Sequence, residues 1–135
     1  MKKLYRMAVI YTCILLCSLA FSASVQAKEA NAQIEPRMDS IYTYGTELSI
    51  SSDGVASISG FVRGKSGVNS THVKVTLQKK VSGEWVDVES WEESNDTRST
   101  SIAETYQVSH GTYRVVMTCS ADDETETATS AERTY

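Results

Sequence analysis

The sequence has few of the residues that cross-link small exported proteins. It contains three cysteines and one proline in 135 residues. Two of the cysteines, Cys13 and Cys17, lie within the first 27 residues. A chain that has lost this segment keeps only Cys119, so it cannot form an internal disulfide. We expect Cys119 to be a small buried residue of the core rather than a reactive thiol.

Histidine is also scarce, which leaves little material for nucleophilic catalysis. A serine or cysteine nucleophile needs a histidine base within hydrogen-bond reach. His72 falls on the polar side of a predicted strand, and His110 precedes Gly111 in a predicted turn. The sequence also lacks a Gly-x-Ser-x-Gly elbow. We therefore predict a protein that is not an enzyme, has no catalytic residues and needs no cofactor.

Positive charge is in short supply. The chain has 13 basic and 17 acidic residues, a net charge of −4. Removal of residues 1–27 would take Lys2, Lys3 and Arg6, leaving ten basic residues against the same 17 acidic ones and a net charge of −7. Such a chain is repelled by polyphosphate, which excludes nucleic acid as a general partner.

The first 27 residues have the pattern of a secretory signal peptide. A cationic start, Met1 to Arg6, precedes an apolar run from Met7 to Phe21, and small residues end at Ala27. The apolar run is shorter than the ~20 residues that cross a bilayer, which disfavours the alternative of an uncleaved anchor. Lipid attachment at Cys13 or Cys17 is disfavoured because Thr12 and Leu16 are poor matches to the small residue expected before a lipidated cysteine. We expect cleavage after Ala27, a secreted, extracellular product, and contact with a membrane only through this segment before cleavage.

Beyond the signal, hydrophobic residues recur at every second position, which is typical of half-buried strands. Residues 28–45 lack this alternation and are interpreted as a flexible or loosely docked leader, with Ile41, Tyr42 and Tyr44 as the candidates for packing onto the domain. From residue 46 to 135 the alternation predicts six or seven short strands, separated by turns such as Asp53-Gly54 and Ser82-Gly83. The clearest inward rows are Val73-Val75-Leu77 and Tyr113-Val115-Met117-Cys119, and the Thr-rich end from Glu124 is predicted to be an edge strand. The fold class is all-β: an antiparallel, immunoglobulin-like sandwich, with a small β-barrel as the alternative.

Four motifs carry a resemblance to known proteins: Leu77-Gln78-Lys79-Lys80, Ser82-Gly83-Glu84-Trp85, Ser90-Trp91 and Gly111-Thr112-Tyr113-Arg114-Val115. In this order they resemble a group of small exported bacterial proteins of unassigned function with immunoglobulin-like or related sandwich domains. The similarity spans about Leu48 to Ala121 and implies architecture and export only. The chain departs from antibody-type domains, because it lacks the cysteine pair between the sheets and has no tyrosine two residues before Cys119, where the tyrosine corner is expected.

The candidate binding residues are Trp85, Asp87, Glu89 and Trp91. In an unbroken strand all four share one face, opposite Val86 and Val88, with the two indoles roughly 20 Å apart. Exposed indoles beside carboxylates suit an extended glycan. The alternatives are a β-bulge that turns one indole inward, and indoles that cover a sheet edge.

A second acidic cluster, Asp122, Asp123, Glu124 and Glu126, offers oxygen ligands but lacks the spacing of a calcium loop, so no metal site is predicted. We expect a non-catalytic binding or surface-interaction module, with a glycan or a cell-surface component as its partner. The alternative is a structural protein that self-associates through a sheet edge.

Overall fold

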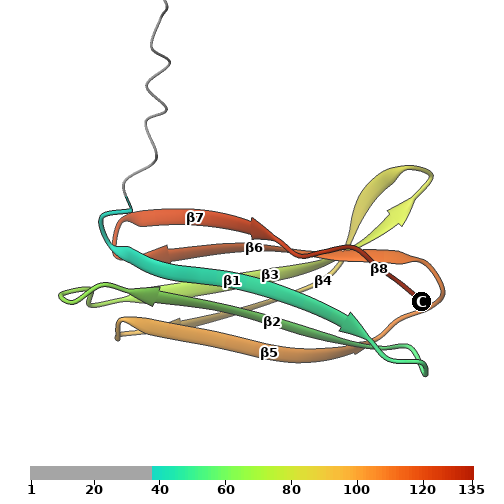
Figure 1. The fold of residues 1–135 in the computed structure, drawn as a ribbon, viewed down its shortest axis with the longest axis horizontal. Helices are drawn as coiled ribbons and strands as arrows, with labels where there is room; N and C mark the ends of the chain where they lie inside the picture. Colours follow the sequence, from blue (N-terminus) through green and yellow to red (C-terminus); the bar gives the residue numbers. More distant parts are fainter. Residues whose placement is uncertain (1–37) are drawn as a thin grey trace, which may run out of the picture. The chain divides into compact units, whose positions relative to one another are not determined.

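The computed structural model describes residues 38–135, which form eight β-strands (Figure 1). The strands are β1 (Ile41–Ile50), β2 (Val55–Gly64), β3 (Thr71–Val81), β4 (Glu84–Asn95), β5 (Ser99–Gln107), β6 (Thr112–Ala121), β7 (Glu124–Thr129) and β8 (Arg133–Thr134). Within this part of the chain no helix is long and apolar enough to cross a membrane. The predicted signal peptide and residues 28–37 of the predicted leader lie outside the described residues.

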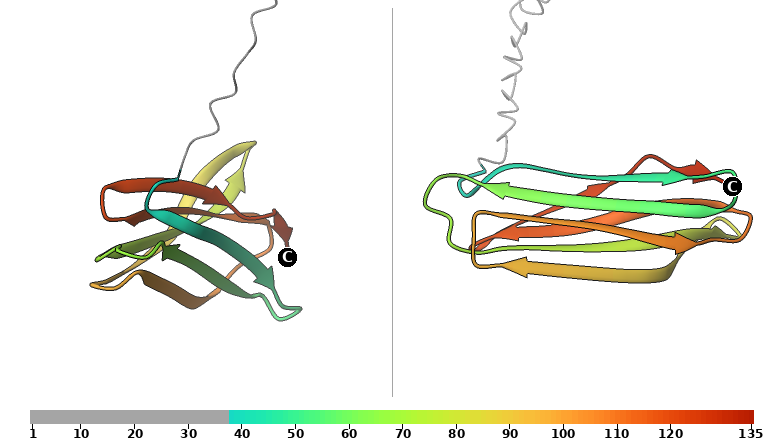
Figure 2. Two further views of the ribbon diagram at one scale, coloured as in Figure 1. Left: turned by 60° about the vertical axis from the view of Figure 1, so that its left-hand side comes forward. Right: turned by 90° about the horizontal axis from the view of Figure 1, so that it is seen from below.

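The strands make two antiparallel sheets, seen as separate layers in Figure 2. One sheet has three strands in the order β1-β2-β5. The other has the order β4-β3-β6-β7, with β8 also pairing with β6. This arrangement is an immunoglobulin-like sandwich, because β5 returns to the first sheet after the β3–β4 hairpin has joined the second. The predicted sandwich is confirmed, and the alternative of a closed barrel is wrong.

The core lies between the sheets and uses the predicted alternation. Val73, Val75 and Leu77 of β3 are fully buried, as are Met117 and Cys119 of β6. The turn residues also match. Gly54, Ser82 and Gly83 all have positive φ, which Gly tolerates without steric cost and which a tight hairpin requires.

Gly60, at the middle of β2, lies at a close approach of the two sheets. A Cβ atom at this position would lie 2.7 Å from Val75 Cγ1 and 2.9 Å from Met117 Sδ. Only hydrogen fits there, so the glycine allows the sheets to pack at this point.

The predicted boundary between leader and domain at residue 46 is wrong. Strand β1 begins at Ile41, which is 1% exposed. The alternation was hidden because a β-bulge at Tyr42 shifts the register between Ile41 and Thr43. The start of the strand is further fixed by Glu124, whose carboxylate accepts backbone N–H groups from residues 39 to 41 at 3.0, 2.7 and 2.6 Å.

A tyrosine corner is present, contrary to the sequence comparison with antibody domains. The hydroxyl of Tyr113, at the start of β6, donates to the backbone carbonyl of Ser109 at 2.8 Å. Tyr113 is 2% exposed. The expected position of this tyrosine, two residues before Cys119, assumes that Cys119 occupies the position of the disulfide cysteine in antibody domains. The position of Tyr113, six residues before Cys119, shows that it does not.

Candidate functional site

Strand β4 does not run unbroken, and this separates the two tryptophans. Leu77 pairs with Glu89 and Gln78 with Asp87, so Val88 has no partner on β3 and forms a β-bulge. The bulge reverses the faces on its two sides. The prediction that Trp85 and Trp91 share one face is therefore wrong, and the bulge alternative holds.

Trp91 faces the core. It pairs with the fully buried Val75 and meets Tyr106 of β5 edge to face, with ring centroids 6.0 Å apart. This contact closes one side of the sandwich, where β4 and β5 are the edge strands of the two sheets. Edge-to-face pairs of this kind add about 0.5–1.5 kcal/mol beyond the area they bury. Trp91 therefore has a structural role.

Trp85 lies on the outer face of the five-stranded sheet, in a hairpin that curls away from the sandwich (Figure 1). The guanidinium of Arg114 lies 4.3 Å from its ring centroid, and the ammonium of Lys80 lies 5.4 Å away. Two cations therefore already contact the indole that was predicted to stack on a sugar.

The two predicted acids are also separated. The carboxylate of Asp87 accepts a hydrogen bond from Gln78 Nε2 at 2.8 Å, and Gln78 Oε1 accepts one from Arg114 Nε at 2.8 Å. Asp87 thus stays near Trp85 through this chain of polar contacts. Glu89 pairs instead with Leu77, beyond the bulge, and is exposed. The four predicted site residues do not form one surface.

The acidic turn between β6 and β7 is engaged in structural hydrogen bonds. Asp122 accepts the backbone N–H groups of Asn69 and Ser70, at 3.1 and 3.0 Å, and so ties the β2–β3 loop to this turn. Glu124 holds the start of β1 in the same way. Residues 38–135 contain no group of three or more side chains placed to hold a metal ion.

The two histidines and Cys119 lie in three different environments. His72 lies 3.6 Å from Glu92 on the outer face, and His110 stacks on Tyr135 with ring centroids 4.4 Å apart. Cys119 is fully buried, and this desolvation, with a smaller contribution from nearby Glu126, raises the pKa of its thiol to about 11. The thiol therefore stays protonated and weakly nucleophilic near neutral pH.

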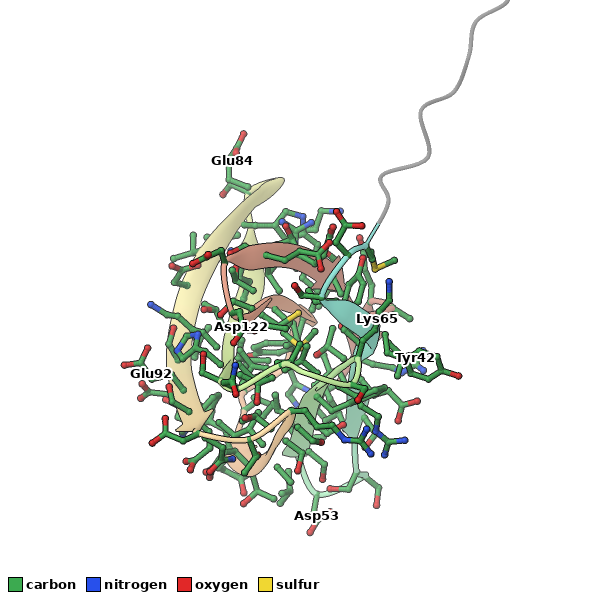
Figure 3. All side chains as sticks on the ribbon, turned by 90° about the vertical axis from the view of Figure 1, so that its left-hand side faces the viewer. Tyr42, Asp53, Lys65, Glu84, Glu92 and Asp122 are labelled. Carbon is green, nitrogen blue, oxygen red and sulfur yellow. The ribbon has the colours of Figure 1, made fainter. Side chains whose placement is uncertain are left out.

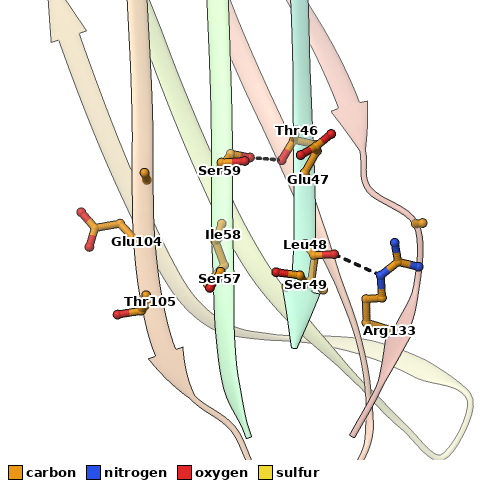
Figure 4. Close-up of a pocket in the computed structure, with 12 residues that line it drawn as sticks. Thr46, Glu47, Leu48, Ser49, Ser57, Ile58, Ser59, Glu104, Thr105 and Arg133 are labelled. Carbon is orange, nitrogen blue, oxygen red and sulfur yellow. Dashed lines mark hydrogen bonds between the residues drawn. The ribbon is translucent and has the colours of Figure 1, made fainter. Parts of the chain in front are cut away.

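A trough of about 700 Å³ lies on the outer face of the three-stranded sheet (Figure 4). Ser57 and Ser59 form its floor on β2, between outward positions of β1 and β5. These side chains point outward because their neighbours along the strand, Ala56 and Ile58, are buried. The side chains that line the trough include Glu47, Ser49, Ser57, Ser59, Ala103, Thr105 and Arg133.

The trough combines small hydroxyl groups with two acidic residues, Glu47 and Glu104, and one basic residue, Arg133. Glu47 pairs with Ser59, and Arg133 is held at the side of β1 by a hydrogen bond from its Nε to the carbonyl of Leu48 at 3.1 Å (Figure 4). Small side chains at these outward positions cover little of the sheet, so the surface there is a depression between the longer side chains around it. Hydroxyl, carboxylate and guanidinium groups together can both donate to and accept from a polar ligand.

Phe61 stands beside the trough on the same face of β2. It is two residues from Ser59, is 43% exposed, and places its ring against Gly45 of β1, where a Cβ atom would lie 3.1 Å from the ring. An aromatic side chain is thus presented next to a row of hydroxyls. The sequence alone did not single out Phe61, because the strand pairing that places it beside the trough is not visible in one strand.

The fold and this surface define an immunoglobulin-like β-sandwich with a polar trough on its smaller sheet. No protein-family model matches the chain, and no curated protein matches it. A solved structure that is similar is the CARDB domain of a protein from Pyrococcus furiosus, described as a complex with di-metal ions. It is 15% identical with a TM-score of 0.38, and the similarity covers 69% of this chain and 89% of that one. A likeness at this level says nothing about what this chain binds.

Proposed function

We propose that this protein is an exported, non-catalytic module that binds a polyhydroxylated ligand, such as a glycan, on the outer face of the three-stranded sheet. The trough over Ser57 and Ser59 carries the proposal, because it is a hollow lined by hydroxyl groups together with Glu47, Glu104 and Arg133. Export is supported by the N-terminal sequence pattern.

The chemistry of the trough suits a sugar better than an apolar molecule. Sugar hydroxyls need partners that both donate and accept, which serine and threonine provide. The apolar face of a sugar ring also needs a flat apolar partner, and Phe61 is exposed beside the hydroxyl row. The earlier candidate, Trp85, is less suited because Arg114 already lies over its ring.

A panel of immobilised glycans tests the proposal. We expect the purified protein to bind at least one glycan, Ser57→Tyr to lose binding because the new ring fills the trough, and Phe61→Ala to bind several-fold more weakly. Two controls should keep wild-type binding: Thr127→Tyr, an exposed site on β7 of the other sheet, and Trp85→Ala. Absence of binding to any glycan, or undiminished binding by Ser57→Tyr, would overturn the proposal.

The second candidate function is self-association through the β3–β4 hairpin. Val81 and Val86 are 48% and 49% exposed there, on opposite strands of the hairpin. Light scattering over a range of protein concentrations separates the two functions. A monomer at every concentration removes this candidate and leaves glycan binding untouched.

A further inference from the structure

A second hollow, of about 310 Å³, lies at the end of the three-stranded sheet and is basic. Arg63, Lys65 and Arg98 line it together with Tyr42, and no carboxylate is among its lining residues. Residues 38–135 contain eight basic and 15 acidic residues, a net charge of −7. Three of these eight cations therefore gather in one hollow of an acidic domain.

The fold builds this hollow from three separate segments. The bulge in β1 sets Tyr42 outward, so that it is 68% exposed, and Figure 3 shows it on the same side of the domain as Lys65. Two backbone hydrogen bonds join the segments: Gly64 donates to the carbonyl of Arg98 at 2.6 Å, and Lys65 donates to that of Ser40 at 2.7 Å. The backbone thus joins the three segments that carry the residues of the hollow.

The two arginines have no acidic partner in the described part of the chain. The one acid–base contact within 4.0 Å among residues 38–135 joins the imidazole of His72 and the carboxylate of Glu92 at 3.6 Å, on the other sheet. Lys65 donates to the backbone carbonyl of Met38. Like charges held close together repel, and an anion bound between them would offset that repulsion. A guanidinium group can donate two parallel hydrogen bonds to two oxygens of one phosphate, which favours phosphate over a halide.

We propose that the hollow formed by Tyr42, Arg63, Lys65 and Arg98 binds a phosphate group, and that the ligand is a phosphorylated glycan or polyol. This rests on the proposed function, because Phe61 links the two hollows. Ser59, Phe61 and Arg63 are alternate residues of β2 and point to the same outer face. At about 3.3 Å per residue, Ser59 and Arg63 stand roughly 13 Å apart, a span that an extended ligand can cover.

An anionic membrane is a poorer ligand than a single phosphate group. A membrane presents many phosphates in one plane. The domain as a whole has a net charge of −7, so such a surface repels it. One phosphate on a slender chain enters the hollow and meets mainly the three cations.

Titration with glycerol 3-phosphate, followed by amide chemical shifts at fixed ionic strength, tests the proposal, with glycerol as the neutral control. We expect the amides of Tyr42, Arg63 and Arg98 to shift, and the double variant Arg63→Gln/Arg98→Gln to bind at least about tenfold more weakly. The matched variant Lys74→Gln/Lys80→Gln removes two charges from β3 in the other sheet and should change affinity less than about twofold. No shift at these amides, or equal loss in the matched variant, would overturn the phosphate site.

Two further measurements distinguish a soluble phosphate ligand from a lipid surface, and the phosphate site from the proposed glycan binding. Vesicles of phosphatidylglycerol should not retain the protein, and retention abolished by Arg63→Gln/Arg98→Gln would overturn a soluble ligand in favour of a lipid surface. Binding of neutral glycans without any response to glycerol 3-phosphate would overturn the phosphate site and keep the proposed function. A response to glycerol 3-phosphate without any glycan binding would do the reverse.

Discussion

Trp91 and Tyr106 meet edge to face across the two sheets, with ring centroids 6.0 Å apart, whereas Trp85 lies on the outer surface under Arg114. One unpaired residue, Val88, produces this difference. The two indoles of one strand therefore have different energetic roles, which mutation can separate.

Trp91→Ala should cost about 2–3 kcal/mol of unfolding free energy, because it opens a cavity beside the core at a half-buried site. Trp85→Ala should cost about 1 kcal/mol, the size of its cation–π contacts. Urea unfolding of the two variants checks this. Equal costs for the two substitutions would contradict the assignment of the indoles to opposite faces.

Gly60→Ala should destabilise the fold by about 1–3 kcal/mol, because the added methyl group meets Val75 and Met117 from the facing sheet. Gly45→Ala is the matched control on β1. Its methyl group meets only the movable ring of Phe61, at 3.1 Å, so its cost should be smaller. Thermal unfolding of both variants measures the difference, and a neutral Gly60→Ala would show that the sheets are less closely packed there.

Glu124 should make the stability depend on pH in the acid range. Partial burial by itself would raise the pKa of this carboxyl group, but backbone N–H donors from Ile41, Ser40 and Asp39, with the charge of Lys65, outweigh it and lower the pKa below the usual 4.5. A lowered pKa in the folded state means that the stabilisation is complete above pH 4.5 and is lost as the pH falls through the folded value.

Glu124→Gln should therefore be about 1 kcal/mol less stable at pH 7, after allowance for solvent at this partly exposed site, and its stability should fall less between pH 5 and pH 3. Urea unfolding at a series of pH values measures both effects. Glu132→Gln, an exposed site, is the control and should follow the wild type. Parallel pH profiles for Glu124→Gln and the wild type would refute the role of Glu124 as an anchor for β1.

Cys119 should report global unfolding. Its thiol is buried and its pKa is raised to about 11, so a maleimide reagent at pH 7 should label the native protein very slowly. Labelling should follow the unfolded fraction as urea is added. Rapid labelling of the native protein would show that Cys119 is accessible.

The alternation of residues was enough to predict the sandwich, its main inward rows and most of its turns. The rows of β3 and β6 were predicted correctly because each lies on a central strand with one buried face. Tyr42 and Val88 were misjudged because a bulge depends on the partner strand and leaves no mark in the strand that contains it.

The candidate site could not be predicted from the sequence, and the reason is again strand pairing. The trough depends on the pairing of β2 with β5, in which Ser57 lies opposite Thr105. Alternation shows that each side chain points outward, but it does not show that they are neighbours. The basic hollow likewise joins Arg63 and Arg98, which only the same pairing brings together. The predicted Trp site failed because its four residues were counted along one strand as if the strand had no bulge.

The most direct test of the account is an amide chemical-shift map of the protein with the glycan that it binds best. We expect the largest shifts on β1, β2 and β5, around Glu47, Ser57, Phe61 and Thr105. A map centred on β3, β4 and β6, around Trp85 and Arg114, would place the binding surface on the other sheet and contradict the account.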